Sequence, residues 1–248
     1  LINRAITRDI DWGVEVPVKN YEKKRIYVWF EAVIGYLSAS IEWAKSDKNI
    51  SNNKNIWKEW WQNPDSKHFY FQGKDNIPFH TIILPAILMG SGEDNLPYDV
   101  VANEYLNFSG KQFSKSKNWA VWVSDFLKQY DSEALRYYLS SIMPESSDSD
   151  FTWDSFFDSN NNELVATFGN LVNRIQSLIK SNFDNIIPDF ETIDDVDNGM
   201  ISAIKNSFDS AGNFLEKRQF RNSLKEIMNL AKLGNRYIDK KEPWSTVK

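Results

Sequence analysis

Two serines and three lysines gather in one short segment and could together bind a polyphosphate. Ser114, Lys115 and Ser116 are flanked by Lys111 and Lys117. Ammonium groups neutralise phosphate charge, and serine hydroxyls add hydrogen bonds. Taken alone, the segment is more typical of a solvated surface loop, because Ser and Lys are common in such loops.

A second group of residues could bind a nucleotide and a small apolar substrate. Gly73 and Asp75 follow an expected strand, where open α/β sheets bind ligands: Gly permits close backbone approach, and Asp can hold a ribose hydroxyl. His80 lies near the start of the next helix, and Trp29 and Tyr36 precede them in the chain. Each has an alternative interpretation. Gly73 and Asp75 could form an ordinary tight turn, His80 could be a structural histidine, and Trp29 and Tyr36 could pack in the core.

Two helical faces near the end of the chain carry nitrogen donors. Asn170 and Arg174 are four residues apart, on a face away from an apolar stripe, and both side chains can read base edges. On the last helix, the basic residues fall within about 60° of arc and oppose an apolar side. These basic residues are Arg218, Arg221, Lys225, Lys232 and Arg236. Both faces are also typical of ordinary solvated helices.

The elements that carry the first groups alternate between strand and helix. Residues 25–30, 68–71 and 99–101 read as strands, while residues 31–45 and a stretch from about residue 78 read as helices. Such alternation favours a parallel α/β sheet. Two or three strands are too few for a complete open sheet, so we expect only half of one.

The pattern becomes helical after about residue 120. We expect helices over residues 131–143, about 160–180, 199–217 and 219–240, the last three forming a bundle. The first bundle helix has an apolar stripe at spacings of 4, 3, 4 and 3, formed by Leu164, Phe168, Leu171, Ile175 and Leu178. This predicts an α/β part over residues 1–105, a connecting region over 106–158 and a helical bundle over 159–248.

Composition excludes several classes of protein. The 248 residues are 42% hydrophobic and 25% charged, which is globular composition. The absence of Cys excludes disulfides, thiolate catalysis and zinc fingers, and with two His we expect no zinc site. No apolar run reaches the roughly 18 residues of a membrane span. The chain begins at Leu1 without a signal-peptide pattern, so we expect a fragment of a cytoplasmic protein.

The order of these motifs resembles methionyl-tRNA synthetase across essentially the whole chain. The resemblance rests on the following segments: Ile6–Asp9, Asp11–Gly13, Tyr27–Tyr36, Gly73–Asp75 with Phe79–His80, Phe113–Ser116, Leu135–Leu139, Asn235–Tyr237 and Glu242–Trp244. It implies an incomplete Rossmann-like class I catalytic domain, then a stem-contact region, then an anticodon-binding helix bundle. The implied activity is ATP-dependent activation of methionine and its transfer to tRNA(Met), with Mg²⁺ accompanying ATP.

The resemblance also implies a role for each candidate residue. Lys115, with Ser114 and Ser116, matches the family's KMSKS loop and would stabilise charge as pyrophosphate leaves. Gly73 and Asp75 match positions that contact ATP. The residues that match the family's methionine pocket are Trp29, Tyr36 and His80. Aromatic walls suit the thioether of methionine. The anticodon readers match Asn170, Arg174 and Trp244.

Several departures bear on catalysis. The family's HIGH motif, which also holds the ATP phosphates, does not occur in this sequence, and Gln112 replaces the first lysine of KMSKS. We therefore expect the 248 residues to be inactive alone, although the parent protein is an enzyme. The alternatives are a non-catalytic tRNA-binding module, a class I synthetase for another amino acid, and a helical interaction domain that follows a small α/β domain. The sequence leaves the oligomeric state open.

Overall fold

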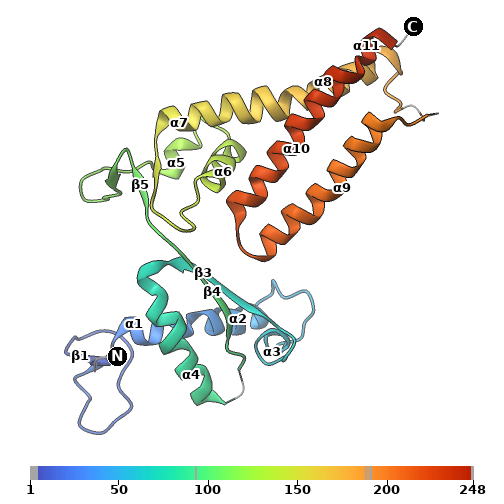
Figure 1. Cartoon of the computed structure of the whole chain (residues 1–248). Helices are drawn as coiled ribbons and strands as arrows, with labels where there is room; N and C mark the ends of the chain where they lie inside the picture. The colour runs from blue at the N-terminus through green and yellow to red at the C-terminus, as the bar shows by residue number, and fades with distance from the viewer. Residues whose placement is uncertain (1–4, 93, 188, 190–191, 247–248) are drawn as a thin grey trace. The chain divides into compact units, whose positions relative to one another are not determined.

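The computed structural model describes residues 5–92, 94–187, 189 and 192–246. It separates two compact units, the first ending at Asn103 and the second beginning at Glu104 (Figure 1). The first unit contains a parallel pair of strands with helices, and the second contains a small sheet and long helices. The expected boundary at residue 105 lies close to this division. The expected boundary at residue 158 falls inside the second unit and remains a prediction.

The first unit is built around one parallel strand pair. Its strands are β1 (Thr7–Arg8), β2 (Arg25–Ile26), β3 (His68–Gly73) and β4 (Pro97–Asn103). Its helical elements are α1 (Val28–Glu31), η1 (Ala32–Ile34), α2 (Gly35–Lys45), α3 (Trp57–Trp61), η2 (Lys74–Asn76), η3 (Phe79–Ile83) and α4 (Leu84–Ser91). β3 and β4 pair in parallel, with Tyr70 opposite Val100. The expected strands at 68–71 and 99–101 and their parallel pairing are therefore confirmed.

The strand expected over residues 25–30 is wrong beyond Ile26. Arg25 and Ile26 pair antiparallel with Thr7 and Arg8, and α1 begins two residues later. The Tyr27 N–H donates to the carbonyl of Ile6 at 2.8 Å, while the Tyr27 carbonyl accepts from Phe30. The chain thus turns directly from a short ladder into a helical turn, in which Val28 and Trp29 stay half-exposed.

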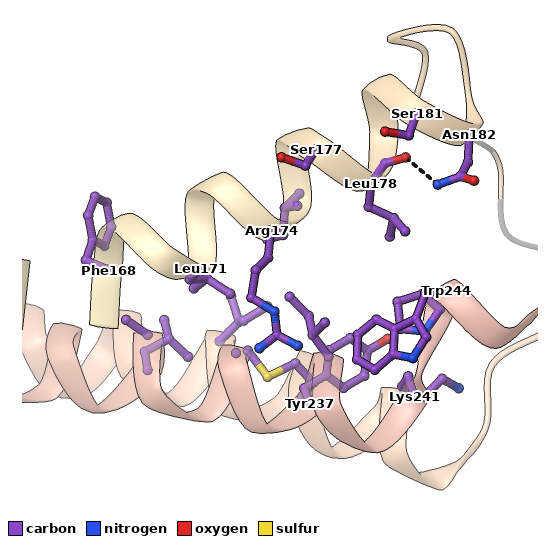
Figure 2. A pocket seen from close by; sticks show the side chains of 18 of the residues that line it. Phe168, Leu171, Arg174, Ser177, Leu178, Ser181, Asn182, Tyr237, Lys241 and Trp244 are labelled. Carbon is purple, nitrogen blue, oxygen red and sulfur yellow. Dashed lines mark hydrogen bonds between the residues drawn. The ribbon is translucent and has the colours of Figure 1, made fainter. Parts of the chain in front are cut away.

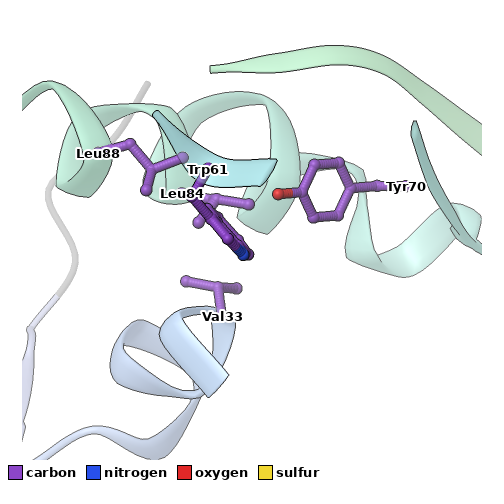
Figure 3. Close-up of a cluster of buried hydrophobic side chains, with 5 residues drawn as sticks. All are labelled: Val33, Trp61, Tyr70, Leu84 and Leu88. Carbon is purple, nitrogen blue, oxygen red and sulfur yellow. The ribbon is translucent and has the colours of Figure 1, made fainter. Parts of the chain in front are cut away.

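A buried cluster holds the parallel pair against the helices. Val33, Trp61, Tyr70, Leu84 and Leu88 form it, from η1, α3, β3 and α4 (Figure 3). Burying a large apolar side chain contributes roughly 1.5–3 kcal/mol. The cluster therefore holds the middle of β3 against η1, α3 and α4.

The second unit joins a three-stranded sheet to helices. Its strands are β5 (Leu106–Phe108), β6 (Lys111–Gln112) and β7 (Ser149–Phe151). Its helical elements are α5 (Val123–Phe126), α6 (Ser132–Ser141), α7 (Trp153–Asp158), η4 (Ser159–Gly169), α8 (Asn170–Asn182), α9 (Asp195–Glu216), α10 (Phe220–Lys241) and α11 (Pro243–Thr246). The sheet order is β6-β5-β7, with β5 antiparallel to β6 and parallel to β7. A second buried cluster, Phe126, Leu135, Tyr138, Phe151 and Phe156, packs the sheet against α5, α6 and α7.

The three expected bundle helices are present, with changes at their ends. α9 begins at Asp195, earlier than expected, because Asp194 caps its first turn and the Asp197 carboxylate returns a hydrogen bond. Arg218 does not belong to the cationic face of α10: it precedes that helix, with a φ of 58°. The first bundle helix is continuous with α7, and its residues 159–169 adopt π-helical winding.

Among the described residues, no helix combines the length and apolar character that a bilayer crossing requires.

Candidate functional sites

Tyr36 and His80 form a hydrogen-bonded pair in the first unit. The Tyr36 hydroxyl lies 2.8 Å from His80 Nε2, and His80 Nδ1 lies 3.0 Å from the carbonyl oxygen of Asn76. Because a carbonyl only accepts, Nδ1 carries the proton, and Nε2 of the neutral ring accepts from the Tyr36 hydroxyl. The pair therefore holds the hydroxyl of Tyr36, a half-exposed residue, in a fixed direction.

The helix that carries His80 is wound irregularly. Residues 79–83 form a single π-helical turn, and Pro85 follows within the first turn of α4. Pro has no N–H to continue the hydrogen-bond ladder, so the preceding turn is free to widen. π-helical turns are frequent at functional sites. His80 is 5% exposed and so is positioned by its surroundings.

Further aromatic rings surround this pair. Tyr70 of β3 lies 5.3 Å from the Tyr36 ring and 5.6 Å from His80, centroid to centroid. Burial, with a smaller contribution from Tyr36, raises the pKa of Tyr70 to about 12, so the phenol stays protonated at neutral pH. The half-exposed Trp29 ring lies 5.8 Å from Phe79, the residue before His80. Two of the three expected pocket residues, Tyr36 of α2 and His80 of η3, thus lie in direct contact, while Trp29 of α1 contacts Phe79, the neighbour of His80 in the chain.

Gly73 and Asp75 lie at the carboxyl end of the parallel pair. Gly73 is the last residue of β3 and pairs with Asn103 of β4, while Asp75 lies in the 3-10 turn that follows. A Cβ atom added to Gly73 would meet no atom within 4 Å, so the backbone here is open to close approach. This is the edge at which parallel sheets bind ligands.

The Ser114–Ser116 segment forms a turn held at both ends. Ser114 and Trp119 exchange two backbone hydrogen bonds of 2.9 Å, and the Lys115 carbonyl accepts from the Asn118 N–H at 3.1 Å. The hydroxyls of Ser114 and Ser116 lie 3.3 Å apart. Lys115 itself is exposed, so its ammonium group is available to a ligand.

Aromatic side chains fix the base of this turn. Phe113 stacks on Phe108 of β5 with centroids 5.7 Å apart, and the Trp119 indole N–H donates to the Phe108 carbonyl at 3.0 Å. Lys111, next to Gln112, places its Nζ 5.3 Å from the Trp119 ring centroid. The turn is thus held on a rigid base while its lysine is presented to solvent.

The three expected anticodon readers lie together in the bundle. Arg174 of α8 pairs with Asp239 of α10 at 2.6 Å, and its guanidinium lies 5.6 Å from the Trp244 ring centroid. Asn170, one turn before Arg174, donates to the Asn235 side chain at 3.0 Å. Their donors are therefore engaged between helices, whereas Trp244 is 54% exposed.

Asn235 connects this group and was not among the expected site residues. Its Oδ1 accepts from Asn170 and, at 3.4 Å, from Arg174. Its Nδ2 donates to the carbonyls of Thr167 and Ala231 at 2.9 and 3.2 Å. One signal in the sequence could have indicated Asn235. Asn235 and Asp239 are four residues apart, and so are their partners on α8, Asn170 and Arg174.

A groove of about 1150 Å³ opens beside this network (Figure 2). Apolar side chains of α8, α9 and α10 form most of its lining, including Leu171, Leu178 and Ile227. Arg174 reaches across from α8 towards α10, and Trp244 lies in α11, just after the end of α10. The groove thus places an exposed indole beside a cation.

The end of α10 is tied to the start of α9. Lys241 Nζ lies 3.0 Å from a carboxylate oxygen of Asp194 and of Asp197, and the Tyr237 hydroxyl donates to Asp197 at 2.7 Å. The backbone N–H of Asp194, then Tyr237 and Lys241, lower the pKa of Asp197. These contacts fix the chain just before Trp244.

No group of three or more His, Cys, Asp or Glu side chains able to hold a metal ion is found in the part of the chain that the structure describes.

Comparison with known sequences identifies the family. The model of the family described as tRNA synthetases class I (M) matches residues 1–176. A methionine–tRNA ligase of Dehalococcoides mccartyi is 51% identical over 248 residues, which are 100% of this chain and 44% of that protein. The ligase of Thermomicrobium roseum is 48% identical over 246 residues, 99% of this chain and 41% of that protein. The chain therefore spans less than half the length of these relatives.

Comparison with known structures supports the same fold. A Mycobacterium tuberculosis methionyl-tRNA synthetase, bound by methionyl-adenylate, matches with a TM-score of 0.84 at 24% identity. The match covers 100% of this chain and 46% of that one. The helix-rich chain with small sheets thus has a class I synthetase fold. The resemblance found in the sequence is confirmed: the chain belongs to the methionyl-tRNA synthetase family of class I tRNA synthetases.

Proposed function

We propose that the chain is part of a methionine–tRNA ligase, which activates methionine with ATP and transfers it to tRNA(Met). The observation that carries the proposal is the identity of 48–51% to proteins named methionine–tRNA ligase over nearly the whole chain. In this proposal residues 1–105 are the second half of a Rossmann-like catalytic domain, and residues 106–158 are the loop and stem-contact region. Residues 159–248 are the anticodon-binding bundle.

The methionine side chain would lie against the aromatic region of the first unit. Tyr36 and His80 fix each other by their hydrogen bond, and Trp29 supplies a further aromatic face. A thioether sulfur gains about 0.3–1.5 kcal/mol from an aromatic contact. We assign specificity for methionine to this combination of apolar faces and one oriented hydroxyl.

ATP, with its Mg²⁺ ion, would bind at the carboxyl edge of the parallel pair. Gly73 allows close approach of the adenosine, and Asp75 supplies a carboxylate to it. Lys115 stabilises the negative charge that develops on the phosphates as pyrophosphate leaves, and Ser114 and Ser116 donate hydrogen bonds there. The exposed position of Lys115 on a fixed turn supports this role.

The bundle would read the anticodon. An unpaired base stacked on the exposed Trp244 ring gains about 1–3 kcal/mol. Asn170 and Arg174 would exchange their contacts with Asn235 and Asp239 for base edges. The present contacts hold Arg174 beside Trp244 and Asn170 one helical turn before Arg174.

Two measurements test the proposal. The first is binding of the chain to tRNA with a methionine anticodon and to the same tRNA changed at one anticodon base, at moderate salt. Discrimination is expected; equal binding would favour a non-specific RNA-binding module. The second is ATP–pyrophosphate exchange, which we expect to stay at background because this sequence lacks the HIGH motif. Exchange well above background would refute the assignment of the chain as catalytically incomplete.

A further inference from the structure

One buried tyrosine contacts both members of the Tyr36–His80 pair. The centroid of the Tyr70 ring lies 5.3 Å from that of Tyr36 at an interplanar angle of 67°, and 5.6 Å from that of His80 at 51°. Edge-to-face arrangements of this kind are favourable for aromatic pairs. The rings of Tyr36 and His80 themselves lie 5.6 Å apart. The three rings therefore form a closed triangle.

Tyr70 is held firmly by its own surroundings. It is 8% exposed and lies in the middle of β3, opposite Val100 of β4. The buried cluster packs it together with side chains from η1, α3 and α4 (Figure 3). Burial raises the pKa of Tyr70 to about 12, so the phenol brings no charge to the neighbouring imidazole at neutral pH. Tyr70 is therefore a fixed and neutral surface against which the other two rings pack.

Tyr36 depends on such a surface because it is 46% exposed. Its backbone is held from α3, since the Trp61 indole N–H donates to the Ser40 hydroxyl at 3.0 Å, and that hydroxyl donates to the Tyr36 carbonyl at 3.0 Å. These bonds hold α2 but do not fix the direction of the phenol ring. A change of the Tyr36 rotamer would separate its hydroxyl from His80 Nε2, which lies 2.8 Å away. Contact with the Tyr70 ring restrains that change.

We propose that Tyr70 is a positioning residue for methionine binding, whose ring holds Tyr36 at the angle at which its hydroxyl donates to His80. The inference rests on the methionine site proposed above. Loss of the Tyr70 ring opens space behind Tyr36, and the hydroxyl then samples directions that do not meet Nε2. Binding of methionine weakens as a result. Gly73 and Asp75, which we assign to ATP, take no part in the triangle of rings, so binding of ATP is spared.

The kinetic test is a double-mutant cycle in the longer protein, with KM for methionine as the readout. Tyr36→Phe and Tyr70→Leu should each raise KM for methionine about fivefold, the factor expected for one hydrogen bond. Because Tyr70 acts through the pair, Tyr70→Leu should add less than about twofold once the Tyr36 hydroxyl is absent. A merely structural role would give factors that multiply. KM for ATP should stay unchanged, and the matched control is Phe69→Leu, which removes a ring of the same strand that contacts Tyr98.

A spectroscopic test uses the 248-residue chain itself. Its two histidines are His68 and His80, so the NMR signals of the imidazole nitrogens are readily assigned. The wild type should show a neutral His80 ring protonated at Nδ1, with the Nε2 signal shifted by the hydrogen bond from Tyr36. In Tyr70→Leu, the Nε2 signal should move to the position that it has in Tyr36→Phe. An Nε2 signal that keeps its wild-type position would overturn the proposal.

The outcomes separate this inference from the proposed function. If Tyr36→Phe leaves KM for methionine unchanged, the methionine site falls and this inference falls with it. If Tyr36→Phe raises KM for methionine but Tyr70→Leu does not, or if the two factors multiply, only this inference is overturned.

Two further variants keep the result decisive. Tyr70→Phe retains the ring, so it should rescue KM for methionine to within about twofold of the wild type. An effect as large as that of Tyr70→Leu would assign the role to the hydroxyl and overturn the role of the ring. Should Tyr70→Leu lose helix content by circular dichroism, Tyr70→Met, whose flexible side chain fills irregular space, replaces it in both tests.

Discussion

A close approach of α8 to α10 makes a glycine substitution informative. A Cβ atom added to Gly234 would lie 2.9 Å from Leu171 Cδ2 and 3.1 Å from its Cδ1. At Gly212, on α9, no atom lies within 4 Å of the same added Cβ. Both glycines lie inside long helices, so substitution by Ala raises the helix propensity equally at the two positions. The two substitutions differ in the packing around the added methyl group.

The expected magnitudes separate the two variants. Replacing Gly by Ala in a helix stabilises by about 1 kcal/mol. Gly212→Ala should therefore raise the free energy of unfolding of the bundle by about that amount. In Gly234→Ala, the added methyl group must displace the end of the Leu171 side chain, and this overpacking costs up to about 1–3 kcal/mol, which offsets the gain in part or in full. We expect the two variants to differ by about 1–3 kcal/mol.

The assay is urea unfolding followed by far-UV circular dichroism, with hydrogen exchange of α10 amides to assign the transition to the bundle. The single variants Leu171→Ala and Gly234→Ala and the double variant together form a double-mutant cycle. In it, the methyl group added at residue 234 should cost less stability when the leucine is absent. Because Asn235 follows Gly234, tRNA discrimination should also weaken in Gly234→Ala. Equal stabilisation by Gly234→Ala and Gly212→Ala would refute the close packing of these helices.

Three further predictions concern the candidate sites. Tyr36→Phe removes the hydroxyl that hydrogen-bonds His80. In the longer protein, KM for methionine should therefore rise about fivefold, as expected for the loss of a hydrogen bond of about 1 kcal/mol, while KM for ATP serves as the control. An unchanged KM for methionine would contradict the pairing of Tyr36 with His80. Trp244→Ala should weaken binding to tRNA with a methionine anticodon by about 1–3 kcal/mol and spare non-specific RNA, and equal losses would argue against base stacking. The lowered pKa of Asp197 means that its contribution to stability is present above the ordinary carboxyl pKa, about 3.9, and is lost as the pH falls towards the lower folded value. Asp197→Asn should therefore flatten the dependence of Tm on pH below about pH 4, and an unaltered profile would remove Asp197 from the cluster.

Local patterns predicted the parallel pair and the bundle helices, but not α3 or the sheet of β5, β6 and β7. The parallel pair β3–β4 and the three bundle helices follow from β-branched runs, turns and helical spacing, which are local properties. The strand over residues 25–30 was wrong beyond Ile26 because residue types do not reveal where a strand loses its pairing partner. Arg218 was misplaced because residue spacing does not reveal where a helix begins.

The partners of the site residues required the tertiary structure. The sequence placed Asn170 and Arg174 on a helical face away from the apolar stripe, but this is wrong for Arg174, which lines the same groove as Leu171 and Leu178. The sequence also could not show that Asn170 and Arg174 contact side chains of α10. Likewise, His80 stood out as a rare residue, while its contacts with Tyr36 and the carbonyl of Asn76 depend on how η3 packs. Side chains far apart in sequence meet only once the helices are placed.

The π-helical winding of η4 has a consequence for natural insertions and deletions. Its wider turns hold more residues than an α-helix needs for the same rotation, so they are equivalent to extra residues inserted into a regular helix. Deleting one residue between 159 and 169 would therefore bring part of the segment to ordinary winding with little net rotation of α8. Asn170 and Arg174 would still face Asn235 and Asp239 of α10. We therefore expect relatives to differ by a residue in this segment while the contacts between α8 and α10 are kept.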